Sequence, residues 1–146
     1  MIMEVRVKKL HPNAQLPTYG SAWAGGADLY ACLEAAVTIQ PGETAWIGTG
    51  IALEVPVGCV GLVYARSSMG AKRGLAPANK VGVVDSDYRG EIRVVLLNHS
   101  KQPQTVEPGE RVAQFVITPV LTPAYREAEE LSDTDRGVGG FGSTGK

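Results

Sequence analysis

The chain has 146 residues, 44% hydrophobic and 20% charged, a composition typical of one soluble globular domain. Its formal net charge of -1 argues against a protein that wraps duplex nucleic acid, because such proteins carry a strongly basic face. The longest aliphatic run, residues 94–97, is far too short to cross a membrane, and the first residues contain no apolar signal-peptide block. We therefore expect a cytoplasmic protein with no nucleic-acid or membrane partner, and a small anionic ligand remains compatible with this charge balance.

Short strands joined by turns are predicted along most of the chain, because 18 glycines and 9 prolines divide it into segments rich in Val, Ile and Thr. Residues 37–43 and 104–110 are similar, and each places a proline and then a glycine at the centre of a turn. We expect these two segments to form hairpin-like corners of one β-fold. The predicted strands cover residues 4–9, 45–55, 60–65, 80–85, 91–98 and 112–120.

Helical periodicity is weak throughout, and the one short helix that we expect lies within residues 67–73. The pattern predicts a single all-β domain, a jelly-roll-like β-barrel that covers residues 1–131. Residues 132–146 contain five glycines and a single aromatic residue, so they cannot build a core. They are predicted to form a flexible, glycine-rich C-terminal arm.

Two interpretations of this arm remain open. A frayed terminus is the simpler one. The other is a ligand-binding segment, since arginine and hydroxyl groups bind phosphate, an aromatic ring stacks on a base, and glycines let backbone N–H groups surround an anion. The residues that favour this second interpretation are Arg136, Phe141, Ser143 and Thr144.

Residues 82–92 lie between two apolar strands and combine acidic residues with a tyrosine, an arginine and a glycine. We expect them to form a hairpin tip. Acidic residues in such a tip are most often ordinary solvated turn residues. In the functional alternative, the Asp85 carboxylate orients a water molecule as a nucleophile, and the Tyr88 ring packs against a sugar.

Arg66, Ser67 and Ser68 directly follow the strand predicted at residues 60–65. Serines at the start of a helix commonly cap it. The same geometry also suits an anion, because a helix N-terminus beside an arginine attracts negative charge. Asp28, which follows a pair of glycines, is either a turn residue or a contact to a magnesium ion through water.

Together these segments resemble the five motifs of the trimeric dUTPases, in the order and at the spacing of that family. Two are highly specific: Gly-Val-Val-Asp-Ser-Asp-Tyr-Arg-Gly-Glu-Ile and Arg-Gly-Val-Gly-Gly-Phe-Gly-Ser-Thr-Gly. The resemblance implies a β-clip fold, a homotrimer with shared active sites, and Mg²⁺-dependent hydrolysis of dUTP to dUMP and pyrophosphate. This reaction lowers dUTP and supplies dUMP for thymidylate synthesis. The matching segments are residues 24–31, 61–72, 79–92, 109–117 and 136–145.

The resemblance also implies roles for residues of the 79–90 segment. Asp85 would activate the attacking water. Tyr88 would pack under the deoxyribose, where a 2′-hydroxyl would clash. Asn79 and the backbone around Val84 would recognise uracil by imitating a pairing partner.

Other motif residues are implied to bind the phosphates. Arg66, Ser67, Ser68 and Gln114 would hold the phosphate chain. Asp28 would hold the magnesium ion through its water shell. The arm would close over the nucleotide, with Phe141 on the uracil, through Arg136, Phe141, Gly142, Ser143 and Thr144.

The sequence departs from the family pattern at Ser68, where glycine is common, and at Gly25, where alanine is common. Arg-Ser-Ser also occurs in the dCTP deaminases, which share the fold, so a deaminase or a bifunctional deaminase-pyrophosphatase is one alternative. A nucleotide-sensing module that binds dUTP and a partner protein is another. The acid at Asp85 and the glycine-rich arm favour the dUTPase over both.

Overall fold

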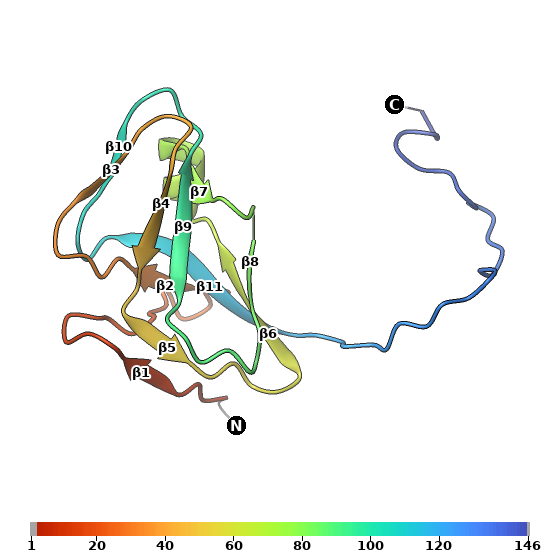
Figure 1. Cartoon of the computed structure of the whole chain (residues 1–146), viewed down its shortest axis with the longest axis horizontal. Coiled ribbons are helices and arrows are strands. Elements are labelled where there is room, and N and C mark those ends of the chain that lie inside the picture. Colours follow the sequence, from red (N-terminus) through yellow and green to blue (C-terminus); the bar gives the residue numbers. More distant parts are fainter. Residues whose placement is uncertain (1–2, 146) are drawn as a thin grey trace.

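The computed structural model describes residues 3–145, and its regular elements are short antiparallel strands and one short helix (Figure 1). This confirms the predicted all-β fold with one short helix. Within the described residues, no helix is both long enough and apolar enough to span a bilayer. The elements are β1 (Val7–Lys9), β2 (Ala27–Tyr30), β3 (Val37–Ile39), β4 (Thr44–Gly48), β5 (Ile51–Leu53), β6 (Cys59–Tyr64), the helix η1 (Ser68–Arg73), β7 (Leu75–Pro77), β8 (Gly82–Val84), β9 (Arg93–Asn98), β10 (Gln104–Val106) and β11 (Arg111–Pro119).

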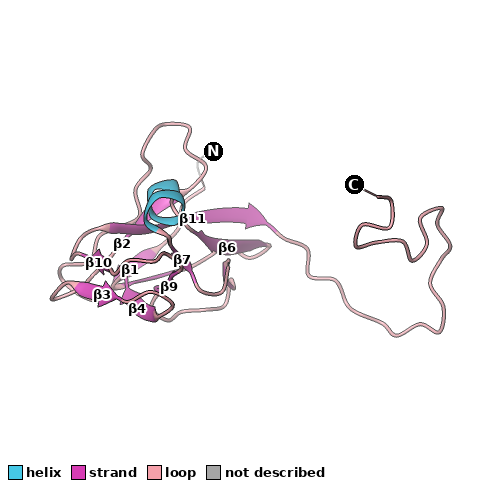
Figure 2. Ribbon diagram, turned by 90° about the horizontal axis from the view of Figure 1, so that it is seen from above, coloured by secondary structure: helices cyan, strands magenta, loops and turns pink. Residues whose placement is uncertain are grey.

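Four small sheets surround one apolar core. Their strand orders are β2-β11-β6-β8, β4-β9-β7, β10-β3 and β1-β5. Figure 2 shows β2, β11 and β6 in one layer and β3 and β4 in another. Buried residues alternate with more exposed ones along β9 and part of β11, and the burial of apolar side chains is the main force that holds the layers together. The core includes Leu29, Ile39, Ile47, Ile51, Leu75, Leu96, Val106 and Phe115.

Both Pro-Gly turns form as predicted, with positive φ angles of 80° at Gly42 and 78° at Gly109. The expected hairpin pairing around them is wrong. Strand β3 pairs with β10, and the strands that leave the turns, β4 and β11, join two other sheets. The two turns are therefore corners at which the chain changes sheets, and the hydroxyls of Thr38 and Thr105 lie 2.9 Å apart between the paired strands.

The strand predicted over residues 45–55 is interrupted at Thr49 and Gly50, which separate β4 from β5. Gly50 has a φ of 68°, and a Cβ atom there would lie 2.8 Å from the Cys32 Sγ and 2.9 Å from the Ala14 Cβ. Only glycine fits this bend. The bend directs β5 away from β9 and toward β1.

The segment between β8 and β9 is not the predicted hairpin tip. Strand β8 pairs with β6, whereas β9 pairs with β4 and β7, so residues 85–92 cross from one sheet to the other. Two strands that were not predicted, β2 and β7, complete these sheets. The crossing leaves a space between β8 and β9 that a hairpin would have closed.

After Pro119 the chain leaves the barrel and runs outward as an irregular arm (Figures 1 and 2). Each hydrogen bond found for residues 121–145 joins two residues of that same segment. The irregular part thus begins before residue 132, where the arm was predicted to start, and Lys146 lies outside the described residues. The barrel is complete without the arm.

Candidate active site

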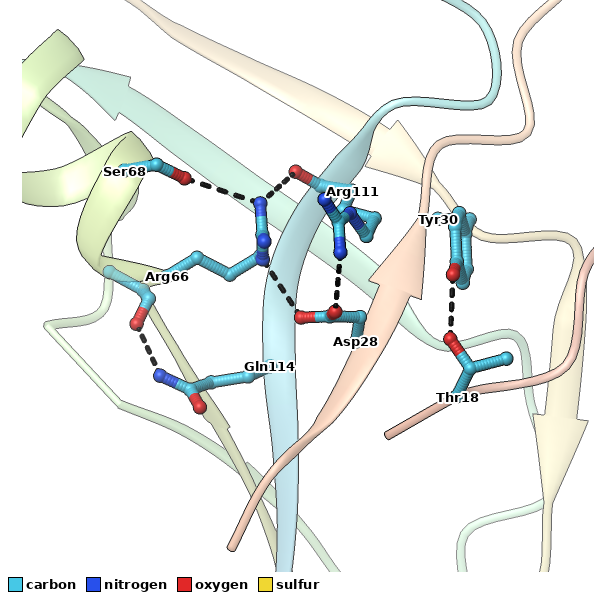
Figure 3. Close-up of polar contacts among 8 residues, drawn as sticks. Thr18, Asp28, Tyr30, Arg66, Ser68, Arg111 and Gln114 are labelled. Atoms are coloured by element: carbon cyan, nitrogen blue, oxygen red, sulfur yellow. Dashed lines mark hydrogen bonds and ion pairs between the residues drawn. The ribbon is translucent and has the colours of Figure 1, made fainter. Parts of the chain in front are cut away.

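An arginine cluster, defined here as Asp28, Arg66 and Arg111, forms where β2, β6 and β11 meet (Figure 3). Arg66 Nε donates to Asp28 Oδ1 at 2.8 Å, and Arg111 Nη1 donates to Asp28 Oδ2 at 3.3 Å. Strand β11 lies between β2 and β6, which is why residues far apart in sequence converge here. One buried carboxylate between two guanidinium groups leaves a formal excess of positive charge, which suits an anion.

The turn interpretation of Asp28 is wrong. Asp28 lies within β2, opposite Gln114 of β11, and its backbone also exchanges two hydrogen bonds with Thr18, at 2.7 and 3.3 Å. Burial in a sheet fixes its carboxylate, so Arg66 and Arg111 are held in place before any ligand binds.

The two serines do not cap the helix through their side chains as the structural alternative required. Ser67 occupies the N-cap position of η1, but its side chain makes no capping hydrogen bond. Ser68 Oγ instead accepts a bond from Arg66 Nη1 at 3.2 Å. Gln114 Nε2 donates to Ala65 O at 2.9 Å, so the amide lies beside the same arginine segment. The structure therefore brings three of the expected phosphate-binding side chains, Arg66, Ser68 and Gln114, to one place (Figure 3).

Arg111 is a member of this cluster that the sequence interpretation missed. It stands at the start of β11, within the motif segment 109–117, directly opposite Tyr30 of β2. The neighbouring Arg73 is paired with Glu110, so it adds little net charge. A shallow depression opens at this point, lined by Tyr30, Arg66, Ser68, Met69, Arg73, Gly109, Glu110 and Arg111.

A second depression lies between β8 and β9 and contains the residues expected to bind base and sugar. Its volume of about 220 Å³ is below the roughly 300–1,000 Å³ of most ligand pockets, so it has room for only part of a nucleotide. Tyr88 lies at its rim, where its hydroxyl donates to Glu91 O at 2.9 Å. The lining includes Trp46, Asn79, Val84, Asp85, Tyr88, Glu91 and Arg93.

The two depressions lie apart in a single chain and share no lining residue. In the β6–β8 pairing, Gly61 is opposite Val84, the residue before Asp85. Arg66 lies five residues after Gly61, two residues beyond the end of β6. At ~3.3 Å for each extended residue, the two positions are separated by up to about 16 Å. Asp85 and Arg66 of one chain are therefore too far apart to act on the same bond.

The arm residues lie away from both depressions. Phe141 is fully exposed, and its φ of 51° places it in the left-handed region. Arg136 Nε donates to Gly139 O at 2.7 Å, within the arm itself. Gly142, Ser143 and Thr144 follow in the last turn of the described chain. These residues do not contribute to either depression of their own chain.

The arginine cluster offers a divalent cation a single carboxylate, that of Asp28. Within residues 3–145, no three His, Cys, Asp or Glu side chains gather in a group that could hold a metal ion. Asp28 is the one carboxylate in the arginine cluster, and both of its oxygens accept bonds from arginines. Mg²⁺ usually keeps several waters and binds one or two carboxylates together with substrate phosphates, which is compatible with this arrangement.

An all-β fold with a positively charged cluster, a small pocket elsewhere on the same chain and a glycine-rich arm suits the class of enzymes that bind small anionic nucleotides. The family model described as dUTPase matches residues 12–145. Because this match covers most of the chain, the chain belongs to the dUTPase family.

Curated relatives and solved structures support this assignment over nearly the whole chain. The deoxyuridine 5'-triphosphate nucleotidohydrolase of Syntrophotalea carbinolica is 45% identical over 141 residues, 97% of this chain and 96% of that protein. The enzyme of the same name from Nautilia profundicola is 46% identical and covers 99% of this chain and 100% of its own. A mutant dUTPase of Staphylococcus bacteriophage 80alpha with dUpNHpp has a TM-score of 0.86 at 29% identity, covering 98% and 99%. A mutant dUTPase from phage phi11 of S. aureus, which coordinates a structural Mg(II) ion, has a TM-score of 0.80 at 25% identity, covering 90% and 100%.

Proposed function

We propose that this protein hydrolyses dUTP to dUMP and pyrophosphate in the cytoplasm, and so lowers dUTP and supplies dUMP for thymidylate synthesis. The observation that carries the proposal is the arginine cluster, in which the buried Asp28 holds Arg66 and Arg111 ready for a polyphosphate. Relatives that cover nearly the whole chain are dUTP nucleotidohydrolases, which supports uracil as the base and the triphosphate as the anion.

The reaction proceeds by direct attack of a positioned water molecule, without a covalent nucleophile. Asp85 is exposed just after the end of β8. Its carboxylate accepts a proton from a water molecule as the water oxygen attacks the α-phosphorus. A new P–O bond forms in line with the bond that breaks between the α-phosphorus and the bridging oxygen, and pyrophosphate leaves. Catalysis of this kind depends mainly on positioning and on neutralising charge.

Base and sugar occupy the depression between β8 and β9. The Asn79 side chain and the backbone around Val84 bind the edge of uracil, and both residues line this space. The Tyr88 ring packs against the deoxyribose and leaves no room for a 2′-hydroxyl. The depression accepts only a fragment of the nucleotide, so the phosphates extend out of it.

The phosphate chain binds at the arginine cluster. Arg66 and Arg111 offset its negative charge, while Ser67, Ser68 and Gln114 supply hydrogen bonds. Asp28 contacts Mg²⁺ through water. When bound, the ion offsets phosphate charge and orients the oxygens of the triphosphate. The phi11 dUTPase, which coordinates a structural Mg(II) ion, supports a place for this metal in the family.

One complete site draws on three chains. The separation of Asp85 from Arg66 along β6 supports this, because a single chain cannot bring both to one phosphate. The arm, whose described residues 121–145 make no hydrogen bond to their own barrel, extends to a neighbour, where Arg136, Ser143 and Thr144 bind the terminal phosphates. Phe141 stacks on the uracil, and Gly142 brings backbone N–H groups close to the anion.

We expect the protein to sediment as a homotrimer even when dilute, because its active sites require partner chains. Analytical ultracentrifugation across a wide range of concentrations measures this, with activity recorded in the same samples. A monomer that retains full activity would contradict the shared-site arrangement and leave the reaction itself untouched.

The reaction is tested by the release of pyrophosphate from each deoxynucleoside triphosphate in magnesium buffer. We expect turnover of dUTP and little turnover of dCTP, whose base edge differs, or of UTP, whose 2′-hydroxyl has no room beside Tyr88. An ammonia assay with dCTP separates a deaminase from a pyrophosphatase. Tight binding of dUTP without pyrophosphate release would instead identify a nucleotide-sensing module.

A further inference from the structure

Tyr88 is held in place by its own loop rather than by the barrel core. Its side chain is 42% exposed, and its phenol donates to Glu91 O at 2.9 Å. The ring lies over Gly90, where a Cβ atom would approach the phenol oxygen to 2.5 Å. The position of Tyr88 therefore depends on the position of the Glu91 backbone.

The Glu91 side chain ties that backbone to the bend between β4 and β5. Glu91 Oε2 accepts a hydrogen bond from Gly50 N at 3.0 Å. The carboxylate reaches this N–H because residue 48 is a glycine, at which a Cβ atom would lie 2.6 Å from Oε2. Gly50 itself is confined by Cys32 and Ala14, so the anchor point is rigid.

The next residue is tied to the same bend. Ile92 O accepts bonds from Thr49 N at 3.2 Å and Thr49 Oγ1 at 2.5 Å, and Ile92 N donates to Ile51 O at 2.8 Å. Glu91 O shares its peptide plane with Ile92 N, so these bonds also hold the acceptor of the Tyr88 hydroxyl. The bond from Gly50 N to the Glu91 carboxylate adds a second restraint on residue 91.

Among the described residues, the Glu91 carboxylate takes part in no ion pair. Arg93, two residues later at the start of β9, instead stacks over the Trp46 ring at 4.9 Å. The half-buried Glu91 carboxylate accepts its hydrogen bond from a backbone N–H, that of Gly50. Because a hydrogen bond to a charged acceptor is stronger than a neutral one, this bond restrains the position of Glu91.

We propose that Glu91 is a positioning residue for sugar selection: its carboxylate, bound to Gly50 N, sets the place of Tyr88 and so controls discrimination between dUTP and UTP. The inference rests on the proposed dUTP hydrolysis. Loss of the anchor lets the Tyr88 ring move away from the sugar and admits a 2′-hydroxyl. Asp85, six residues earlier in the same loop, keeps its chemistry.

The test compares kcat/KM for UTP and dUTP in folded trimers of several variants. Glu91→Ala should raise the UTP-to-dUTP ratio about tenfold, the factor expected for losing one anchoring hydrogen bond. Glu91→Gln keeps an acceptor oxygen and should stay within about twofold of the wild type. Tyr88→Phe keeps the ring but loses its tether, so it should resemble Glu91→Ala, and the double variant should add little more.

Glu54→Gln is the matched control, because Glu54 pairs with Arg89 of the same loop only at the exposed surface. It should leave the ratio unchanged. An unchanged ratio in Glu91→Ala, or equal changes in Glu91→Ala and Glu91→Gln, would overturn the anchoring role. If Glu91→Ala does not fold, Tyr88→Phe decides alone: an unchanged ratio there rejects the tether. A wild-type protein that releases no pyrophosphate from dUTP would instead overturn the proposed function together with this inference.

Discussion

Replacement of Asp85 by asparagine is expected to lower kcat for dUTP by about 10²–10⁴-fold, the range typical of a lost general base. The amide has nearly the same size as the carboxylate but cannot accept the proton of the attacking water. Asp85 is exposed at the end of β8 and makes no ion pair among the described residues, so the barrel should remain stable. Pyrophosphate release measures turnover, and calorimetry measures the binding of dUpNHpp.

Asp87→Asn supplies the control for this experiment. Asp87 is an equally exposed acid of the same loop, but it does not line the depression between β8 and β9. It should retain normal turnover and normal nucleotide binding. Near-normal turnover in Asp85→Asn would remove Asp85 from its proposed role, whereas equal losses in both variants would indicate a general effect of loop charge.

Truncation after Asp135 is expected to leave a folded trimer that is nearly inactive. Residues 121–145 make no hydrogen bond to the barrel of their own chain, so their loss should not change the thermal unfolding of the barrel. Closing the arm over a ligand costs about 1–2 kcal/mol of backbone entropy for each ordered residue. Arg136, Ser143 and Thr144 must offset this cost through contacts with the terminal phosphates, which dUMP lacks.

Hydrogen exchange on the arm tests the same proposal directly. The arm should exchange slowly with dUpNHpp bound and fast with dUMP or without nucleotide. Phe141→Ala should be milder than truncation, because a single stacking contact is worth roughly 1–3 kcal/mol. Equal exchange rates with dUpNHpp, with dUMP and without nucleotide would indicate that the arm is a frayed terminus.

Local features of the fold could be predicted from sequence, whereas long-range pairing could not. The turns at Gly42 and Gly109 follow from the conformations that proline and glycine favour. The pairing of β3 with β10 depends on contacts between distant segments that no local pattern encodes. The break at Gly50 was missed for a related reason: the apolar run continues across it, and its cause is the close packing of Cys32 and Ala14.

The candidate site shows the same division. Arg66, Asp85 and Tyr88 stand in motifs that can be recognised one at a time. That Asp28 holds Arg66 and Arg111 could not be foreseen, since it results from β11 lying between β2 and β6. The anchoring of Glu91 to Gly50 likewise exists only because the chain crosses between sheets at residues 85–92.

Because the proposed shared site takes Arg66 and Asp85 from different chains of a trimer, two different loss-of-function alleles should complement each other within one cell. A chain that lacks Arg66 can still contribute Asp85 to an active site shared with its neighbour. A chain that lacks Asp85 can likewise contribute Arg66. Under random assembly of equal amounts, about a quarter of all sites would receive both intact residues. A heterozygote of two inactive alleles would then keep a measurable share of activity that neither homozygote has.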